Sequence, residues 1–385
     1  AEINAAKAVL DSGFMTMGER CRAFEAEFAE YFGAEHAVMV NSGSSANLLA
    51  LFALADPLLK PDQGYKRLKP GAEIIVPALS WATTVWPVLQ AGAIPVFVDC
   101  DPQTLQVSPD AVEAAITPDT AAIVLVHVLG GAVDSKSIAD IAKRHGLWLF
   151  EDSCEALGVK LNGKHVGTFG DMGSFSFYFS HHITTIEGGM VVTNNDGLAD
   201  LLRSLRAHGW VRDMKGGDTI ARQHTDIDRR FLFATAGFNV RPTEINAAIG
   251  SEQLKRLDGF NETRRSIARR FDEGLNDLQQ QGNLQLVSYD NRVLPAPFGY
   301  TVICKSAEHR NGLNAHLLDR GIETRPVICG NMTRQPVLAH YKHRVSGTLA
   351  GADRVMDCGL YWGTHPFMEA ADIDYVIDAV QEYFR

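Results

Sequence analysis

Between residues 73 and 193, short apolar runs alternate with longer stretches of helical pattern, and this alternation restricts the fold more than any other feature. The runs are continuously apolar, which is typical of strands buried on both faces. The predicted strands are Glu73–Pro77, Ile94–Asp99, Ala122–Val126, Leu147–Asp152 and Gly189–Thr193. Such strands separated by helices predict an α/β fold with a mainly parallel sheet, and ligands at the carboxyl ends of its strands.

The patterns on either side of this region suggest how the chain is divided. Glu19–Phe32 carries phenylalanines at i, i+4 spacing and is predicted to form an amphipathic helix. From about Arg241 the pattern changes to helical segments followed by mixed strand and helix, including Phe298–Ile303. We therefore expect a large domain in residues 1–245, with an N-terminal segment that packs on the other domain. Residues 246–385 are predicted to form a smaller α/β domain.

The charge balance bears on possible partners. The chain has 385 residues, with 36 basic and 46 acidic side chains and a formal net charge of -10. This argues against a general nucleic-acid binder or a protein that binds anionic membranes, since both need basic surfaces. A phosphate-bearing ligand remains possible, because backbone amides and a few cations can hold a phosphate.

The cysteines indicate the compartment. They are scattered, with no CxxC pair, at Cys21, Cys100, Cys154, Cys304, Cys329 and Cys358. This usage is typical of a reducing cytoplasm rather than of a disulfide framework or a zinc site. No apolar run approaches the length of a membrane span. We expect a cytoplasmic protein with no metal site.

A run of small polar residues, Asn41–Asn47, precedes an apolar helix predicted at Leu48–Ala55. Backbone amides and hydroxyls of Gly43, Ser44 and Ser45 at such a helix start can hold an anion. The same residues also suit an ordinary N-cap, for which Ser and Asn are favoured. The pattern alone leaves both interpretations open.

Other candidate ligand residues are spread along the chain. Asp152 closes a predicted strand, where it could bind a ligand or simply begin a turn. Trp81 could stack on a ring or pack in the core. Ser176 could hold a phosphate. Taken singly, each of these residues is explained as well by structure as by function.

Together these residues resemble a known family. Their order, the segment Ser176–Gly189 with its closing Glu187-Gly188-Gly189, and the segment Gly237–Pro242 resemble the DegT/DnrJ/EryC1/StrS family of sugar aminotransferases over nearly the whole chain. The resemblance implies the fold of the type I transferases that depend on pyridoxal phosphate (PLP). That fold has a large domain built on a mixed, mainly parallel seven-stranded sheet, and a smaller C-terminal domain.

The resemblance also implies roles for the candidates. The Gly43–Ser45 loop and Ser176 would hold the cofactor phosphate, and Trp81 would stack on its ring. Asp152 would pair with the protonated ring nitrogen, which keeps the ring able to store electrons. Glu155 departs from the pattern, because most relatives have Gln there beside the ring hydroxyl.

Further implied residues lie in the second half of the chain. Asn239 would reach the cofactor phosphate of the neighbouring subunit, which implies a homodimer with shared active sites. By resemblance, His208 would face the substrate or glutamate; otherwise it lies at a helix end capped by Gly209. Arg241 would bind a glutamate carboxylate through two hydrogen bonds, or it is a surface residue before a turn.

His181 is the decisive departure from the family pattern, because it stands where relatives place the cofactor lysine. A lysine amine can form a Schiff base with PLP, whereas an imidazole cannot but still moves protons near neutral pH. The substitution points away from transamination. It also makes no metal site with His182, because adjacent side chains on an extended segment point to opposite faces.

The lysine-less members of the family imply a specific reaction. It is the removal of the C3 hydroxyl from a 4-keto-6-deoxy nucleotide sugar, with GDP-4-keto-6-deoxy-D-mannose as the expected substrate, as in colitose and O-antigen biosynthesis. PLP alternates with pyridoxamine phosphate (PMP), L-glutamate supplies the amino group and ammonia is released. His181 would be the acid and base.

Two alternatives to this reaction remain open. A related enzyme class acts on CDP- or dTDP-sugars with a reductase and a [2Fe–2S] cluster, which needs four thiolates. This chain has no cysteine between Cys154 and Cys304, so we expect no iron–sulfur cluster. A non-catalytic PLP-binding module is the other alternative. Retention of Asp152, Ser176 and a titratable residue at position 181 argues against it.

Overall fold

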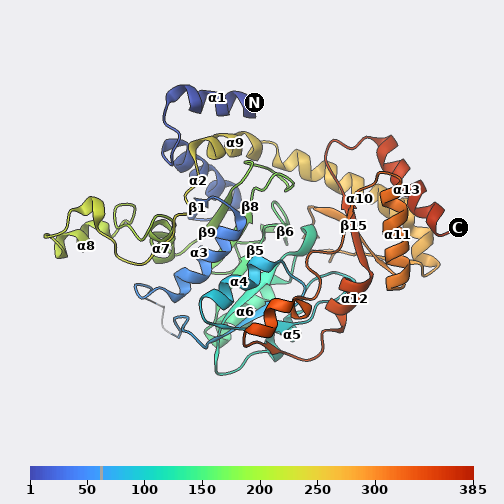
Figure 1. Cartoon of the computed structure of the whole chain (residues 1–385), viewed down its shortest axis with the longest axis horizontal. Coiled ribbons are helices and arrows are strands. Elements are labelled where there is room, and N and C mark those ends of the chain that lie inside the picture. Colours follow the sequence, from blue (N-terminus) through green and yellow to red (C-terminus); the bar gives the residue numbers. More distant parts are fainter. Residues whose placement is uncertain (61–63) are drawn as a thin grey trace.

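A central sheet with helices on both faces forms the body of the molecule (Figure 1). The structure is a computed structural model that describes residues 1–60 and 64–385. Within that part, eight strands pair in the order β1-β9-β8-β5-β4-β2-β3-β14. In chain order they are β1 (His36–Val40), β2 (Glu73–Pro77), β3 (Ile94–Val98), β4 (Thr120–Val126), β5 (Trp148–Asp152), β8 (Met172–Ser176), β9 (Gly189–Thr193) and β14 (Arg344–Val345).

The mixed, mainly parallel character expected of this sheet is confirmed. Strand β9 runs antiparallel to its neighbours β1 and β8, whereas β8, β5, β4, β2 and β3 pair in parallel. The seven strands implied by the family resemblance are joined by β14. This two-residue strand comes from the C-terminal region and pairs in parallel with β3.

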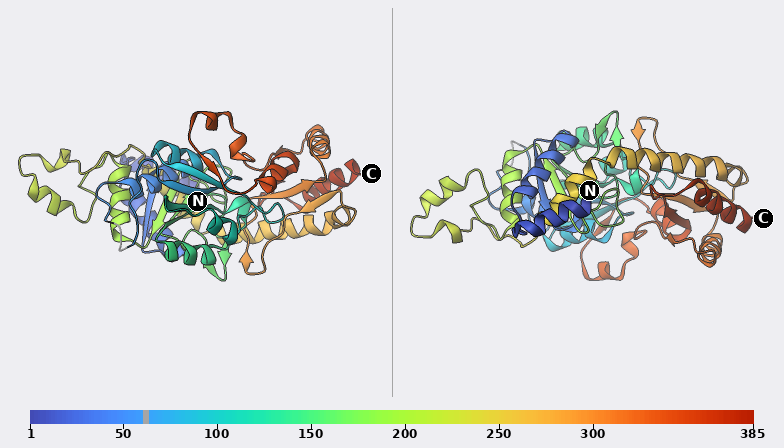
Figure 2. Two further views of the ribbon diagram at one scale, coloured as in Figure 1. Left: turned by 90° about the horizontal axis from the view of Figure 1, so that it is seen from below. Right: turned by 90° about the horizontal axis from the view of Figure 1, so that it is seen from above.

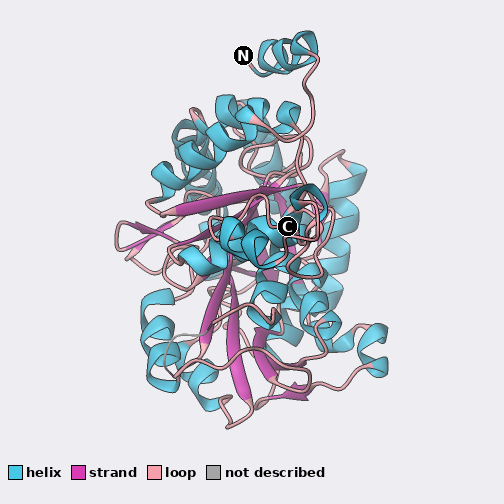
Figure 3. Ribbon diagram, turned by 90° about the vertical axis from the view of Figure 1, so that its left-hand side faces the viewer, coloured by secondary structure: helices cyan, strands magenta, loops and turns pink. Residues whose placement is uncertain are grey.

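Both faces of the sheet are buried, which explains the continuous apolar runs. Val124 and Phe150 face one core with Leu49 and Leu202 from the helices. Ile123 belongs to the core on the opposite face. Figure 3 shows the strands enclosed by helices. The covering helices are α3 (Gly43–Ala55), α4 (Ala82–Gln90), α5 (Pro109–Ala114), α6 (Ser135–His145) and α7 (Asp196–Arg206).

The predicted N-terminal amphipathic helix is confirmed as α2 (Glu19–Phe32). Its phenylalanines form an aromatic core with the end of β8. The rings of Phe28 and Phe175 lie 5.2 Å apart, and Phe24 and Phe177 lie 5.5 Å apart. The i, i+4 spacing therefore marks the face that packs on the sheet.

The sequence prediction omitted β1 and β8. Strand β1 reads His-Ala-Val-Met-Val, an apolar run like those of the predicted strands. Strand β8 reads Met-Gly-Ser-Phe-Ser, with small residues where other strands have Val or Ile. A Cβ on Gly173 would lie 2.0 Å from the carbonyl oxygen of Gly167. Small residues are required here because the backbone of a neighbouring loop crosses the strand.

A second, smaller domain lies beyond the sheet, towards the C-terminus (Figure 2). Its antiparallel sheet has the order β10-β12-β15-β13, from β10 (Leu284–Leu286), β12 (Gly299–Cys304), β13 (Thr324–Arg325) and β15 (Gly359–Gly363). Strand β12 matches the predicted strand within one residue. The helices are α10 (Leu257–Gln280), α11 (Ala307–Asp319), α12 (Ala350–Cys358) and α13 (Ala370–Tyr383). Phe271, Val302, Leu313 and Trp362 lie in its core.

Short elements link the two parts. A small sheet joins β6 (Lys160–Leu161), β7 (Lys164–His165) and β11 (Val293–Leu294). Short 3₁₀ turns occur at η1 (Val128–Gly130), η2 (Arg229–Phe231), η3 (Met332–Arg334) and η4 (Pro336–His340). No helix in residues 1–60 or 64–385 is long and apolar enough to cross a membrane.

The packing around α9 (Glu244–Leu254) bears on the domain boundary. Helix α1 (Glu2–Ser12) lies on α9, and Gln253 donates a hydrogen bond to Glu2 at 2.6 Å. Leu254 of α9 and Leu257, the first residue of α10, pack in the same core as α2. Phe271, farther along α10, packs in the core of the small domain. In place of a division at 245/246, we propose a boundary inside α10.

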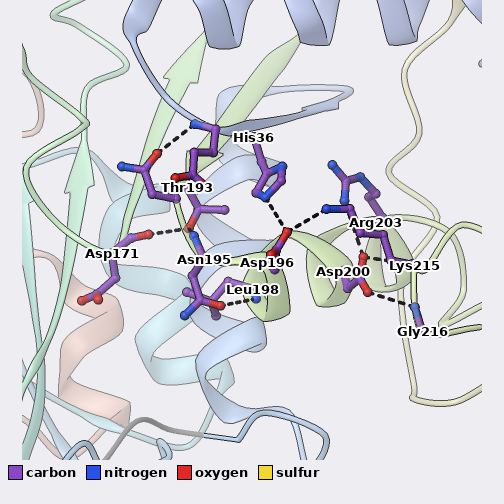
Figure 4. Close-up of polar contacts among 12 residues, drawn as sticks. His36, Asp171, Thr193, Asn195, Asp196, Leu198, Asp200, Arg203, Lys215 and Gly216 are labelled. Carbon is purple, nitrogen blue, oxygen red and sulfur yellow. Dashed lines mark hydrogen bonds and ion pairs between the residues drawn. The ribbon is translucent and has the colours of Figure 1, made fainter.

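Residues 211–236, which we call the arm, project from the body at the left of Figure 1 and contain α8 (Gly217–Gln223). Helix α7 anchors the base of the arm (Figure 4). The amine of Lys215 donates to Asp196 at 2.7 Å, and the backbone N–H groups of Lys215 and Gly216 donate to Asp200. Four residues separate the last residue of α7 from the start of the arm, so this helix holds the point where the arm leaves the body.

Candidate active site

A cavity of about 500 Å³ opens where β4, β5 and β8 end and α3 begins. Val126, Asp152 and Ser176 mark these strand ends, and Gly43 marks the helix start. Phe298 and Tyr361 close the cavity from the small-domain side. Its place at the carboxyl ends of parallel strands is the one that an open α/β sheet favours for ligands.

Asp152 lies in this cavity with 4% of its surface exposed. Its Oδ2 accepts hydrogen bonds from Asn47 Nδ2 at 2.7 Å and from Thr84 Oγ1 at 2.8 Å. Asn47 is itself oriented by Ser174, whose hydroxyl donates to Asn47 Oδ1 at 2.6 Å. A buried carboxylate held in this way favours a cationic partner, such as a protonated ring nitrogen.

Gly43 and Ser176 approach each other closely in the wall of the cavity. A Cβ on Gly43 would lie 2.5 Å from Cβ and 2.9 Å from Oγ of Ser176. Any side chain on Gly43 would therefore fill the space where backbone amides and the Ser176 hydroxyl converge. This small, amide-lined recess at the start of α3 is of the kind that holds a phosphate.

Of the two serines after Gly43, one fits the predicted ligand site and the other fits an ordinary helix N-cap. Ser44 lines the cavity, and its hydroxyl donates to Thr83. Ser45 does not line it; its hydroxyl donates to Asn41 at 2.6 Å, and its N–H donates to the N-cap residue Ser42. The segment is thus both a helix cap and a cavity wall. Helix α3 also begins at Gly43, earlier than the predicted Leu48.

Trp81 lines the cavity and keeps 53% of its surface exposed. The core-packing interpretation of this residue is therefore wrong. Its indole precedes α4 and leaves a ring face available for stacking.

Glu155 also lines the cavity. Its Oε2 accepts the backbone N–H of Leu129 at 3.0 Å. Burial raises the pKa of Glu155 to about 7. The carboxyl group can therefore exist in both protonation states near neutral pH.

His181 lies in the cavity wall with its ring perpendicular to that of Phe298, at a centroid distance of 5.1 Å. Its Nδ1 has no hydrogen-bond partner among the described residues. Burial lowers the pKa of His181 to about 4. The ring is neutral at pH 7 and able to accept a proton.

His182 behaves differently from its neighbour. It does not line the cavity, is 2% exposed, and its Nε2 lies 2.8 Å from the carbonyl oxygen of Ala296. In residues 1–60 and 64–385, no cluster of three His, Cys, Asp or Glu side chains could hold a metal ion.

His208, Asn239 and Arg241 do not line the cavity of this chain. They lie together at the base of the arm, where Arg241 Nε donates to Asn239 Oδ1 at 3.0 Å. The His208 ring lies 5.0 Å from the Trp210 ring, and the Arg241 guanidinium lies 5.7 Å from the Trp210 ring. We call this group, completed by Trp210 and Arg212, the Trp210 cluster. The segment is also a helix end, as the alternative interpretation had it. Helix α7 ends at Arg206 with Ala207 as its C-cap, and the N–H of Gly209 donates to the carbonyl of Ser204 in the last turn.

Several cavity residues escape sequence reasoning, including Asn47, Thr84, Tyr178, Phe298 and Tyr361. Asn47 had a usable signal, because it lies four positions after Gly43 on the same helix and so shares its face. Phe298 and Tyr361 had none, because they reach the cavity only through the packing of the small domain.

Comparisons with known proteins agree with this geometry. The model of the DegT/DnrJ/EryC1/StrS aminotransferase family matches residues 1–381. The chain is 40% identical over 374 residues to GDP-4-keto-6-deoxy-D-mannose 3-dehydratase of Yersinia pseudotuberculosis, covering 94% of this chain and 91% of that one. It is 39% identical over 380 residues to dTDP-4-dehydro-2,6-dideoxy-D-glucose 3-dehydratase of Saccharopolyspora spinosa, covering 95% and 80%.

A solved structure gives the same result. The chain is similar to a GDP-4-keto-6-deoxymannose-3-dehydratase with a trapped PLP-glutamate geminal diamine. The TM-score is 0.88 at 37% identity, and the match covers 98% of this chain and 97% of the other. The transferase fold expected from the sequence is confirmed.

Proposed function

Because the chain belongs to the DegT/DnrJ/EryC1/StrS aminotransferase family, we propose that it is a PLP-dependent nucleotide-sugar 3-dehydratase. It removes the C3 hydroxyl of a 4-keto-6-deoxy sugar, with GDP-4-keto-6-deoxy-D-mannose as the preferred substrate. The observation that carries the proposal is His181, a neutral imidazole in the wall of the cavity at the position of the family's lysine.

The residues present fit the cofactor. The recess between Gly43 and Ser176 would hold the phosphate, the fixed carboxylate of Asp152 would pair with the ring nitrogen, and Trp81 offers a stacking face. When bound, PLP supplies an electron sink for the carbon attached to its ring. The amide of Asn47 and the hydroxyl of Thr84 fix the orientation of the Asp152 carboxylate by hydrogen bonds.

His181 carries the proton transfers in this proposal. Its low pKa leaves the ring free to take a proton at neutral pH, and it makes the protonated ring a strong acid. The same imidazole can therefore accept a proton and then deliver it to the departing C3 hydroxyl. General acid and base catalysis of this kind contributes about 10²- to 10⁴-fold in rate. A histidine at this position also forms no covalent bond that would retain the cofactor.

The Trp210 cluster supports a homodimer with shared active sites. Its members lie outside the cavity of their own chain, yet they combine an amide, a histidine and guanidinium groups suited to anionic ligands. The arm that follows the cluster exposes the apolar side chains of Ile227, Phe231 and Phe233, and the Phe233 ring stacks with that of Trp210. Exposed apolar groups on a projection are typical of an interface. Asn239 would reach the partner's phosphate site, and Arg241 the carboxylate of L-glutamate.

The cysteines support a location in the cytoplasm. All six lie in the described part of the chain and are free thiols. Free buried thiols are the rule where glutathione keeps the surroundings reducing.

The test is product analysis. The protein, PLP and L-glutamate are incubated with GDP-, CDP- and dTDP-linked 4-keto-6-deoxy sugars, without any reductase, and the products are weighed. We expect a product lighter by one oxygen atom, together with ammonia and 2-oxoglutarate, and fastest from the GDP-sugar. His181→Asn should bind PLP and give no deoxygenated product. An amino sugar as the main product would refute the proposal.

A further inference from the structure

Residues 296–298, which we call the strap, cross from β11 to the small-domain strand β12 beside the cavity. The strap is bonded to the turn η1 of the large domain. The N–H of Ala296 donates to Gly130 at 3.0 Å, and the N–H of Phe298 donates to Leu129 at 3.2 Å. The contact is close, because a Cβ on Gly130 would lie 1.8 Å from the carbonyl oxygen of Ala296.

The small domain holds the other side of the strap. The hydroxyl of Thr364 donates to the carbonyl of Pro297 at 2.8 Å. The guanidinium of Arg264, buried in α10, lies 3.3 Å from the carbonyl oxygen of Phe298 and 3.4 Å from that of Pro297. The strap is therefore a place where the two domains are joined by hydrogen bonds.

His182 adds the remaining tie. A carbonyl oxygen only accepts hydrogen bonds, so Nε2 of His182 must carry the hydrogen that is donated to Ala296. Nδ1 of the same ring has no partner among the described residues. The ring is held in one tautomer and one orientation by the strap.

The strap contacts the titratable groups of the cavity. The Phe298 ring stands perpendicular to the His181 ring. Leu129, which pairs with Phe298, presents its own N–H to Glu155 at 3.0 Å. A shift of the strap would therefore move both the Phe298 ring beside His181 and the Leu129 N–H that donates to Glu155.

We propose that His182 is a positioning residue, which fastens the strap to the loop that carries His181 and so fixes the imidazole of His181 in the cavity. This inference rests on the proposed function, in which His181 moves the protons. His182 itself does not line the cavity. Through its hydrogen bond to Ala296, His182 couples the position of the strap, and so of the small domain, to the position of His181.

Substitutions at His182 separate this role from simple space filling. In His182→Gln, the amide nitrogen can take the place of Nε2 and keep the bond to Ala296. In His182→Asn, the amide lies where Nδ1 was and cannot reach, and His182→Leu has no donor. We expect kcat to fall about 10- to 100-fold in the Asn and Leu variants, with KM for the nucleotide sugar within about twofold, and to remain within about threefold in the Gln variant.

A matched control is His165→Leu. His165 is also buried and also has an Nδ1 without a partner, but its ring packs against Phe32 and makes no hydrogen bond to the strap. We expect this variant to lower thermal stability and leave kcat within about twofold. An equal loss of kcat in His165→Leu and His182→Leu would overturn the proposal, because general loosening would then explain both.

Hydrogen exchange in the cofactor-free protein tests the tie directly. The amides of Ala296 and Phe298 should exchange at least about tenfold faster in His182→Leu and His182→Asn, and at the wild-type rate in His182→Gln. Should His182→Leu fail to fold, Thr364→Val removes a tie from the other side of the strap and should speed the same amides. Unchanged strap exchange in His182→Asn and Thr364→Val would refute the proposal.

The two proposals fail in different ways. If the wild-type protein gives no deoxygenated product, the proposed function is wrong. The exchange rates, measured without cofactor or substrate, still decide whether His182 holds the strap.

Discussion

The carboxylate of Glu244, at the start of α9, accepts the backbone N–H of Gly18 at 2.7 Å, a contact between residues 226 positions apart. The same carboxylate accepts the N–H groups of Arg20 and Cys21 at the start of α2. A side chain from one helix thus caps another, and it is 3% exposed.

Replacing this cap should destabilise the protein. Glu244→Ala leaves buried N–H groups without partners, and we expect the free energy of unfolding to fall by about 2–4 kcal/mol. Denaturant titration measures the change. Glu252→Ala, on the same helix, removes only a surface pair with Lys255 and should cost less than about 1 kcal/mol. Equal losses in the two variants would contradict the capping role.

The donors to Asp152 should control cofactor affinity. Thr84→Val keeps the shape of the side chain but removes the hydroxyl that donates to Asp152 Oδ2. We expect the Kd for PLP to rise about tenfold, because a hydrogen bond to a buried charged group is lost. Absorbance titration with PLP measures it. Thr263→Val, which removes an exposed hydroxyl on α10, should leave the Kd unchanged.

Glu155 should make stability depend on pH. Burial raises its pKa in the folded protein from 4.5 to about 7, so the folded state keeps a proton that the unfolded chain releases. This contribution to stability is complete below pH 4.5 and is lost as the pH rises through about 7. Relative to Glu155→Gln, the melting temperature of the cofactor-free wild type should fall across this range. Parallel curves for the two proteins would show that the shift is absent.

Shared active sites predict recovery of activity on mixing. His181→Asn and Asn239→Ala should each be inactive as homodimers. A mixed dimer has one site with both substitutions and one with neither, so random mixing should restore about one quarter of wild-type activity. Mixing His181→Asn with Asp152→Asn is the control. Both of these residues line the cavity of one chain, so no activity should return.

Iron should play no part in the reaction. Among the described residues, no three His, Cys, Asp or Glu side chains could hold a metal ion together, so Cys154 lacks the neighbouring thiolates that a cluster needs. We expect metal analysis to find no iron in the active protein, and turnover with glutamate to survive chelators. Turnover that requires a reductase would favour the reductase-dependent reaction instead.

The sequence predicted the parts of this structure that depend on local pattern. Strands β2 and β9 have the predicted bounds, because strands buried on both faces are continuously apolar. Strand β8 was missed because Gly173 and the serines beside it serve a crowded backbone and the cavity rather than the core. At such positions the residue type is set by the space available to the side chain, and hydrophobic periodicity carries no information about that space.

The site residues likewise fall into those that a local motif identifies and those that only the packing of distant segments brings together. Asp152 and His181 were found because a motif places them at the end of a strand or in the cofactor segment. Thr84 and Phe298 were missed because their roles arise only when distant segments meet. The roles of Asn239 and Arg241 remain predictions, because they lie outside the cavity of a single chain.

The continuity of α10 limits how the protein can move. Its first turn packs with the aromatic core of the large domain and its middle with the core of the small one, so a hinge at this crossing would have to break the helix. The strap provides another crossing nearby. Both crossings therefore oppose a wide separation of the two domains along this side. Trp81 lines the cavity and is exposed, so we expect ligands to enter past its side chain rather than by separation of the two domains.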